Sequence, residues 1–285
     1  MIGAHSPSDR VGHTLVEVVL ALLLLSVVSA SAYAVLRSQR RFYAAHLQIA
    51  AARDVARIAV EILSGELRPA SPLAGDLYAI APDSLALRSF TGLGVVCDIS
   101  GDVIRLRRVT GALGDAKADS VLVYLERGFD TAQDDGWAAT ATQRVGAAAG
   151  RRCPDGRVPD VELVVERVIE GATVGSAVRG FRPYVYKLYE SRDGRWWLGQ
   201  RLREGRFQPV VGPFANPTRG GLRFEPLTAS GHPTLDPRRV VQVRISVIAR
   251  SYNRLPGRDA PDFFEDSLST IVFLRNAREQ GSDGS

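Results

Sequence analysis

The strongest pattern along the chain is a predominantly apolar run from Leu15 to Leu36, in which Glu17 is the only charged residue. As a helix, these 22 residues would be about 33 Å long, at about 1.5 Å per residue. The hydrocarbon core of a bilayer is about 30 Å thick. The run therefore predicts a transmembrane segment over about 15–36, and Arg37, Arg40 and Arg41 follow at its far end.

Helical spacing continues beyond the apolar run, but the pattern becomes amphipathic. One side carries Arg53, Asp54, Arg57 and Glu61, and another carries Ala52, Val55, Ile58, Ala59 and Ile62. We therefore expect one long helix over 13–64, whose first half faces lipid or partners and whose second half packs on a domain. Gly65 weakens this helix, and Pro69 and Pro72 end it.

After Pro72 the chain changes to short runs typical of β-strands, separated by turn residues. The predicted strands are 77–80, 84–89, 94–99, 102–107, 120–125, 161–169, 184–189, 195–202, 240–249 and 269–276. Asp193-Gly194 predicts a hairpin, Gly92-Leu93-Gly94 a turn, and 126–160 and 213–238 are expected to be loop-rich. The predicted class is α+β, a long N-terminal helix packed on an antiparallel β-rich domain over 73–276, with a disordered tail over 277–285.

Three interpretations compete for the N-terminal segment. A cleaved secretory signal has an apolar region of roughly 7–15 residues, shorter than this run, although 29–32 imitates a cleavage site. A plain membrane anchor leaves the position of Glu17, two residues inside the apolar edge, unexplained, because a charge within the membrane is costly. The third interpretation rests on the stretch Gly12-His13-Thr14-Leu15-Val16-Glu17 and accounts for that carboxylate.

This stretch resembles the processing site of type IV prepilins and type II secretion prepseudopilins. The resemblance implies that 1–12 is a leader, that prepilin peptidase cuts between Gly12 and His13, and that His13 is then N-methylated. It also implies that Glu17, at the fifth mature position, meets the N-terminal amine of a neighbouring subunit. The chain departs from the family at His13, where Phe or Met is usual, and in a leader whose only basic residue is Arg10.

The resemblance extends to the last predicted strand, 269–276, which is similar to the closing strand of large minor subunits of the J type. It implies a pilin-like fold and a structural role as a minor pilin or pseudopilin, with a place at the filament tip or in assembly initiation. The implied partners are other pilins, through the N-terminal helix, together with prepilin peptidase and the bacterial inner membrane. The implied location is single-pass, with the C-terminal domain in the periplasm or on the cell surface.

The competing class is a membrane-anchored periplasmic enzyme or binding protein, which needs no cut at Gly12. The three arginines after Leu36 would, by the positive-inside tendency alone, place that end in the cytoplasm. Large downstream domains are translocated largely regardless of such charges. The processing motif therefore decides the predicted orientation.

Cys97 and Cys153 are the only cysteines and form a natural disulfide pair in an exported domain. The alternative is two buried free thiols. The net charge of +5 comes from scattered arginines without a basic stripe, so nucleic-acid binding is not expected.

Candidate chemistry is sparse. The four histidines lack the spacing of metal ligands, so no metal site is predicted. Asp130, Asp134 and Asp135 are interpreted as a solvated acidic turn rather than a calcium loop, because the EF-hand spacing is missing. No catalytic motif occurs, so we predict no catalytic residues, no enzyme activity and no cofactor.

Overall fold

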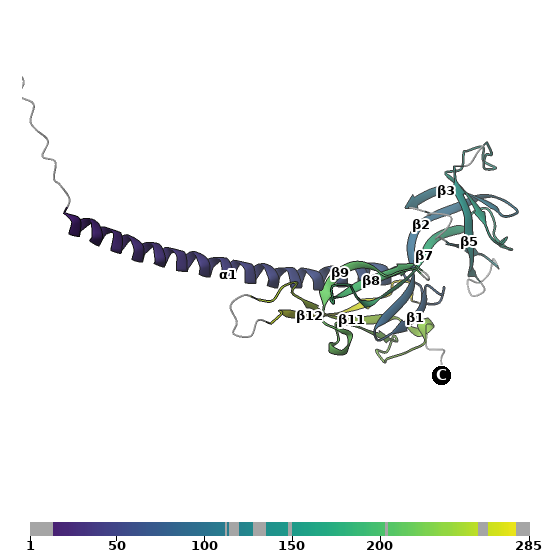
Figure 1. Ribbon diagram of the computed structural model, residues 1–285. Helices are drawn as coiled ribbons and strands as arrows, with labels where there is room; N and C mark the ends of the chain where they lie inside the picture. Colours follow the sequence, from purple (N-terminus) through teal and green to yellow (C-terminus); the bar gives the residue numbers. More distant parts are fainter. Residues whose placement is uncertain are drawn as a thin grey trace, which may run out of the picture.

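The computed structural model describes residues 14–111, 113, 120–127, 135–147, 150–202, 205–255 and 262–277. In this part of the chain, one long helix precedes a twelve-stranded antiparallel sheet (Figure 1). The predicted class, a long N-terminal helix packed on an antiparallel β-rich domain, is confirmed. The predicted leader and all but the first residue of the predicted tail lie outside the described residues.

Helix α1 spans Leu15–Leu67 and ends three residues later than the sequence predicted. Gly65 does not end it, because Leu63 and Leu67 are fully buried against the sheet and hold the last turn in place. The backbone N–H of Arg68 donates to the carbonyl of Ser64 at 3.0 Å and closes the helix just before Pro69.

The strands follow α1 in an unbroken series. They are β1 Leu77–Ala81, β2 Ser84–Ser100, β3 Val103–Gly111, β4 Ser120–Leu125, β5 Gly136–Gly146, β6 Val161–Val165, β7 Ala177–Glu190, β8 Trp196–Leu202, β9 Gln208–Phe214, β10 Leu222–Leu227, β11 Gln242–Arg250 and β12 Glu265–Phe273. Two short 3₁₀ helices, η1 Pro217–Arg219 and η2 Pro237–Arg239, lie between β9 and β11. The hairpin predicted at Asp193-Gly194 joins β7 to β8.

Several local predictions are wrong. The runs 84–89 and 94–99 are one strand, β2, and the expected turn at Gly92-Leu93-Gly94 lies inside it. A side chain at Gly94 would press on Leu106, so glycine there serves close packing against β3 rather than a turn. The regions 126–160 and 213–238 contain β5 and β10, and the strand expected over 161–169 ends at Val165.

The sheet encloses two hydrophobic cores. The first core lies between the end of α1 and β1, β8, β9, β10, β11 and β12, and the second lies among β3, β4, β5 and β6. Strands β2 and β7 are long enough to contribute to both, and they pair with each other from Ser84↔Lys187 to Val95↔Ala177. We call the parts around the two cores the first and second lobes. In Figure 1 the second lobe, with β3 and β5, projects beyond the end of α1.

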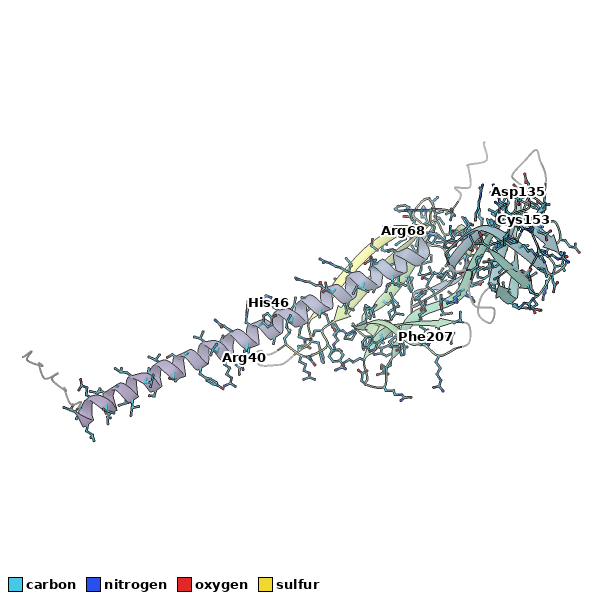
Figure 2. All side chains as sticks on the ribbon, turned by 90° about the horizontal axis from the view of Figure 1, so that it is seen from above. Arg40, His46, Arg68, Asp135, Cys153 and Phe207 are labelled. Carbon is cyan, nitrogen blue, oxygen red and sulfur yellow. A yellow bond between two sulfur atoms is a disulfide. The ribbon has the colours of Figure 1, made fainter. Side chains whose placement is uncertain are left out.

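Only the second half of α1 is docked on the first lobe. Its first side-chain bond to the domain is at Gln48, whose amide oxygen accepts from the backbone N–H of Asn253 at 2.9 Å. The buried stripe begins at Ala52 and continues at helical spacing through Ala56, Ala59, Leu63 and Leu67. Alanine at the first three of these positions allows the helix backbone to approach β9, β11 and β12 closely. Figure 2 shows the undocked half, which carries Arg40, extending far from the sheet.

Candidate functional site

The described chain begins at Thr14, which caps α1. Its side-chain oxygen accepts a hydrogen bond from the backbone N–H of Glu17 at 3.3 Å. Thr14-x-x-Glu17 has the spacing of a capping box, and a carboxylate in the first turn is favoured by the helix dipole. The sequence analysis did not recognise this role of Thr14, although the four-residue pattern was visible.

The three residues predicted for processing and assembly are divided by the limits of the described chain. Gly12 and His13 lie outside the described residues. Glu17 lies in the exposed first turn of α1, and no cation within the described residues is close enough to form an ion pair with it. The partner that the sequence resemblance implies for Glu17 would therefore come from outside this part of the chain.

The first part of α1, from Leu15 to Leu36, exposes a predominantly apolar surface whose only charged residue is Glu17. All residues from Leu15 to Ala44 are exposed, and the large apolar side chains of the run range from 47% exposed at Val18 to 82% at Leu15. Within the described residues, α1 is the one helix long and apolar enough to cross a membrane, and none of its apolar window is buried in the protein. Contiguous apolar surface of this extent is typical of a membrane or protein–protein contact. A single-pass membrane anchor fits this geometry.

The disulfide predicted between Cys97 and Cys153 is present, with the two Cα atoms 5.4 Å apart. Cys97 lies on β2, Cys153 lies in the loop between β5 and β6, and both are buried. The bond attaches this loop to the sheet of the second lobe.

A tight turn next to the disulfide fixes the loop further. The N–H of Gly156 donates to the carbonyl of Cys153 at 2.8 Å. Asp155 accepts from the backbone N–H of Arg157 and forms an ion pair with Arg107 on β3, and these contacts lower the pKa of the Asp155 carboxyl. A shallow cavity of about 390 Å³ adjoins this turn. The disulfide and these contacts therefore hold residues 153–157 against the second lobe.

Two groups of buried ion pairs lie in the sheet domain, one around Arg105 and one around Asp76. Arg105 on β3, which is 5% exposed, donates to Asp98 on β2 at 2.5 Å and to Glu162 on β6 at 3.0 Å. Asp76, which is 1% exposed, accepts from Arg179 on β7 at 3.2 Å and from the backbone N–H of Ser71 at 2.8 Å. The pair between Asp76 and Arg179 holds the segment after α1 against β7.

A cleft of about 830 Å³ lies where the two lobes meet. Its lining includes Phe90, Tyr124, Trp137, Arg179 and Arg275, with Asp135 at one side. The guanidinium of Arg179 lies 5.6 Å from the centre of the Trp137 ring and 5.8 Å from that of Phe90. These aromatic faces and arginine side chains are groups that suit non-covalent binding.

The predicted acidic turn is described only at Asp135, since Asp130 and Asp134 lie outside the described residues. Asp135 accepts from the hydroxyl of Tyr124 at 2.5 Å and from the backbone N–H of Arg127 at 3.2 Å. Its carboxylate is therefore engaged by β4 and the residues that directly follow it. Among the described residues, no group of three or more histidine, cysteine, aspartate or glutamate side chains is arranged to hold a metal ion.

No model of a protein family, no curated protein and no solved structure matches this chain. Functional inference therefore rests on the sequence motif at 12–17 and on the geometry of α1.

Proposed function

We propose that the chain is a minor pilin or pseudopilin, a structural subunit of a type IV pilus or of a type II secretion pseudopilus. The observation that carries the proposal is the division of α1 into an exposed apolar half and a docked half. Its apolar run, Leu15 to Leu36, is about 33 Å long at about 1.5 Å per residue, and exposure of the helix continues to Ala44. Lipid before assembly and neighbouring helices after assembly would cover the same apolar surface.

The proposal includes removal of the leader. Peptidase cleavage between Gly12 and His13 would place a new amine four residues before Glu17, at the edge of the apolar run. Intact-mass measurement of membrane-extracted protein tests this step and should show loss of residues 1–12, with or without an added methyl group. A chain that still begins at Met1, or one cut near Ala32, would contradict it.

Glu17 is proposed to join subunits. Its carboxylate would attract the N-terminal amine of a neighbouring subunit, and exclusion of water from the filament would strengthen that attraction. The pair would set the axial position of one helix against the next.

Glu17 also has the position of the glutamate in a capping box with Thr14, where it would stabilise the start of α1. Substitutions distinguish this role from pairing with an amine. Glutamine can replace glutamate in a capping box but carries no charge. If pairing with an amine matters, Glu17→Gln and Glu17→Ala should both insert in the membrane, be cleaved and fail to crosslink to partner pilins. Asp54→Asn, at an exposed carboxylate on the docked half of the same helix, is the matched control and should crosslink normally. Normal crosslinking of Glu17→Gln would show that the charge has no role in assembly.

Localisation follows from the same proposal. The helix would span the bacterial inner membrane once, and the sheet domain would lie in the periplasm or, within a filament, at the cell surface. The Cys97–Cys153 disulfide supports an oxidising compartment for the domain, because such bonds are rare in the cytoplasm.

A second candidate function is that of a membrane-anchored binding protein. The observation in its favour is the cleft of about 830 Å³, with its aromatic and arginine lining. Substitution of Gly12 distinguishes the two functions, because an anchored binding protein does not need the cut. Gly12→Ala should abolish entry into the filament if the chain is a pilin, and should leave its membrane fractionation and activity unchanged if it is an anchored binder.

A further inference from the structure

Three arginines interrupt α1 directly after the apolar run. We call Arg37, Arg40 and Arg41 the arginine collar. They are the only arginine, lysine or acidic residues between Glu17 and Arg53, and all three are exposed. Within the described part of the chain, no carboxylate forms an ion pair with any of them, whereas Arg53 in the docked half pairs with Asp266 at 3.5 Å. The collar is therefore a concentrated positive charge without a partner in the described fold.

The collar has the spacing of a single helix face, because residues three and four apart lie next to one another. Aromatic side chains follow at once, with Phe42 67% and Tyr43 66% exposed. The ring of His46 packs on Phe42, with their centroids 4.2 Å apart. Exposed aromatic rings beside basic residues at the end of an apolar helix are typical of the membrane–water interface.

The distances along the helix agree with this position. The headgroup layer adds roughly 5–8 Å to each side of the hydrocarbon core. With Leu36 at the edge of that core, the collar lies about 1.5 to 7.5 Å beyond it, at the depth of the phosphates. Ala52, the first buried residue of α1, lies about 24 Å beyond Leu36, so the docked part of the helix stands clear of the headgroups.

We propose that the arginine collar binds the headgroups of anionic phospholipids and thereby fixes the depth of α1 in the bilayer. Guanidinium groups form paired hydrogen bonds with phosphate oxygens, and a net charge of three would concentrate anionic lipid around the helix. An acidic patch on another protein is the competing partner. Lipid is favoured because the collar directly adjoins the apolar run and is followed by exposed aromatic rings. The inference depends on membrane insertion of α1 and not on assembly into a filament.

The test uses the full-length protein reconstituted in phosphatidylcholine bilayers that contain a trace of spin-labelled phosphatidylglycerol or spin-labelled phosphatidylcholine. The fraction of motionally restricted label gives the relative association of each lipid with the helix. At low salt we expect phosphatidylglycerol to be preferred about fivefold or more. One arginine near an anionic surface contributes about this much to the attraction, and the collar has three. The preference should weaken at high salt because the charges are screened.

Substitutions test whether the arginine collar causes the preference for phosphatidylglycerol. The triple substitution Arg37→Gln, Arg40→Gln and Arg41→Gln should reduce the preference to about one, whereas replacement of all three by lysine should retain most of it. The control removes the same charge from the sheet domain by Arg223→Gln, Arg238→Gln and Arg239→Gln, at exposed arginines for which the described structure shows no ion pair. This control should bind phosphatidylglycerol as the unmodified chain does. Circular dichroism checks that each variant is folded.

Three results would overturn the proposal. The unmodified chain would show no preference between the two lipids, the glutamine collar variant would keep the full preference, or the control would lose as much as the collar variant. Because the measurement uses isolated subunits in bilayers, failure of filament assembly cannot produce any of these results. Conversely, a confirmed lipid preference would leave the proposed pilin function to be tested at Gly12 and Glu17.

Discussion

Replacement of Leu63 by alanine tests whether α1 has two halves with different physical roles. Leu63 is fully buried in the first core, where it faces the sheet. The substitution removes three carbon atoms, worth about 2.4 kcal/mol at roughly 0.8 kcal/mol each. The cavity left behind adds to this, so Leu63→Ala should lower the free energy of unfolding by about 3 kcal/mol.

Leu23→Ala is the matched control, since it makes the same chemical change on the same helix. Leu23 is 58% exposed in the undocked half and is not among the described residues that pack in the first core. Its replacement should change the free energy of unfolding of the domain by no more than about 0.5 kcal/mol, as is usual for surface sites.

Urea unfolding of the full-length protein in detergent micelles measures both variants. The three tryptophans, Trp137, Trp196 and Trp197, all lie in the sheet domain, and Trp196 packs against the first core, so their fluorescence reports on the domain. With a slope of about 1–3 kcal/mol per molar urea, Leu63→Ala should lower the midpoint by about 1 M or more. Equal midpoints for Leu63→Ala and Leu23→Ala would refute the division of the helix.

Two further predictions concern the sheet domain. Replacing Cys97 and Cys153 together by alanine should lower the free energy of unfolding by roughly 4 kcal/mol, because the bond joins residues 56 positions apart and so closes a long loop. A loss below about 1 kcal/mol in urea unfolding would contradict this. Burial, together with the nearby carboxylate of Glu66, raises the pKa of Tyr186 above its ordinary value of 10.0. The folded state therefore holds this proton more tightly than the unfolded state, and the resulting stability is complete below pH 10 and is lost as the pH rises above it. Unfolding measured from pH 9 to 12 should depend less on pH in Tyr186→Phe, and identical profiles would exclude a contribution from Tyr186.

The existence of α1 could be predicted from sequence because its apolar run and its later amphipathic spacing are both local patterns. The buried face was predicted only in part. Ala52 and Ala59 are buried as expected, but Ile58 is 44% exposed, and Ala56 is a member of the buried stripe. Hydropathy favoured isoleucine, whereas close approach of the helix to the sheet requires small side chains.

Strands β5, β9 and β10 were missed by the sequence analysis, and β5 and β10 lack a local signal. Strand β5 is rich in small residues, and β10 contains Pro226 between a glutamate and a leucine. They form strands because they pair with other strands of the sheet. Strand β5 lies between β4 and β6, and β10 pairs with β11. Pairing of this kind depends on the whole sheet and is not visible in a short window of sequence.

The candidate sites also differ in whether neighbouring residues in the sequence are enough to predict them. The disulfide could be predicted because the chain has only two cysteines. The cleft between the lobes could not, because Phe90, Trp137 and Arg275 reach it from distant parts of the sequence. The motif at 12–17 was found from adjacent residues alone, and its glycine and histidine lie outside the described structure.

The shared strands β2 and β7 have a mechanical consequence. They pair through eleven residue positions along their length, and each strand enters both cores. A pull on the second lobe directed along these strands would load their hydrogen bonds together, in shear, instead of opening them one after another from an end. The two lobes should therefore transmit tension along this axis as one stiff body. A force applied across the strands should pull β2 and β7 apart far more easily.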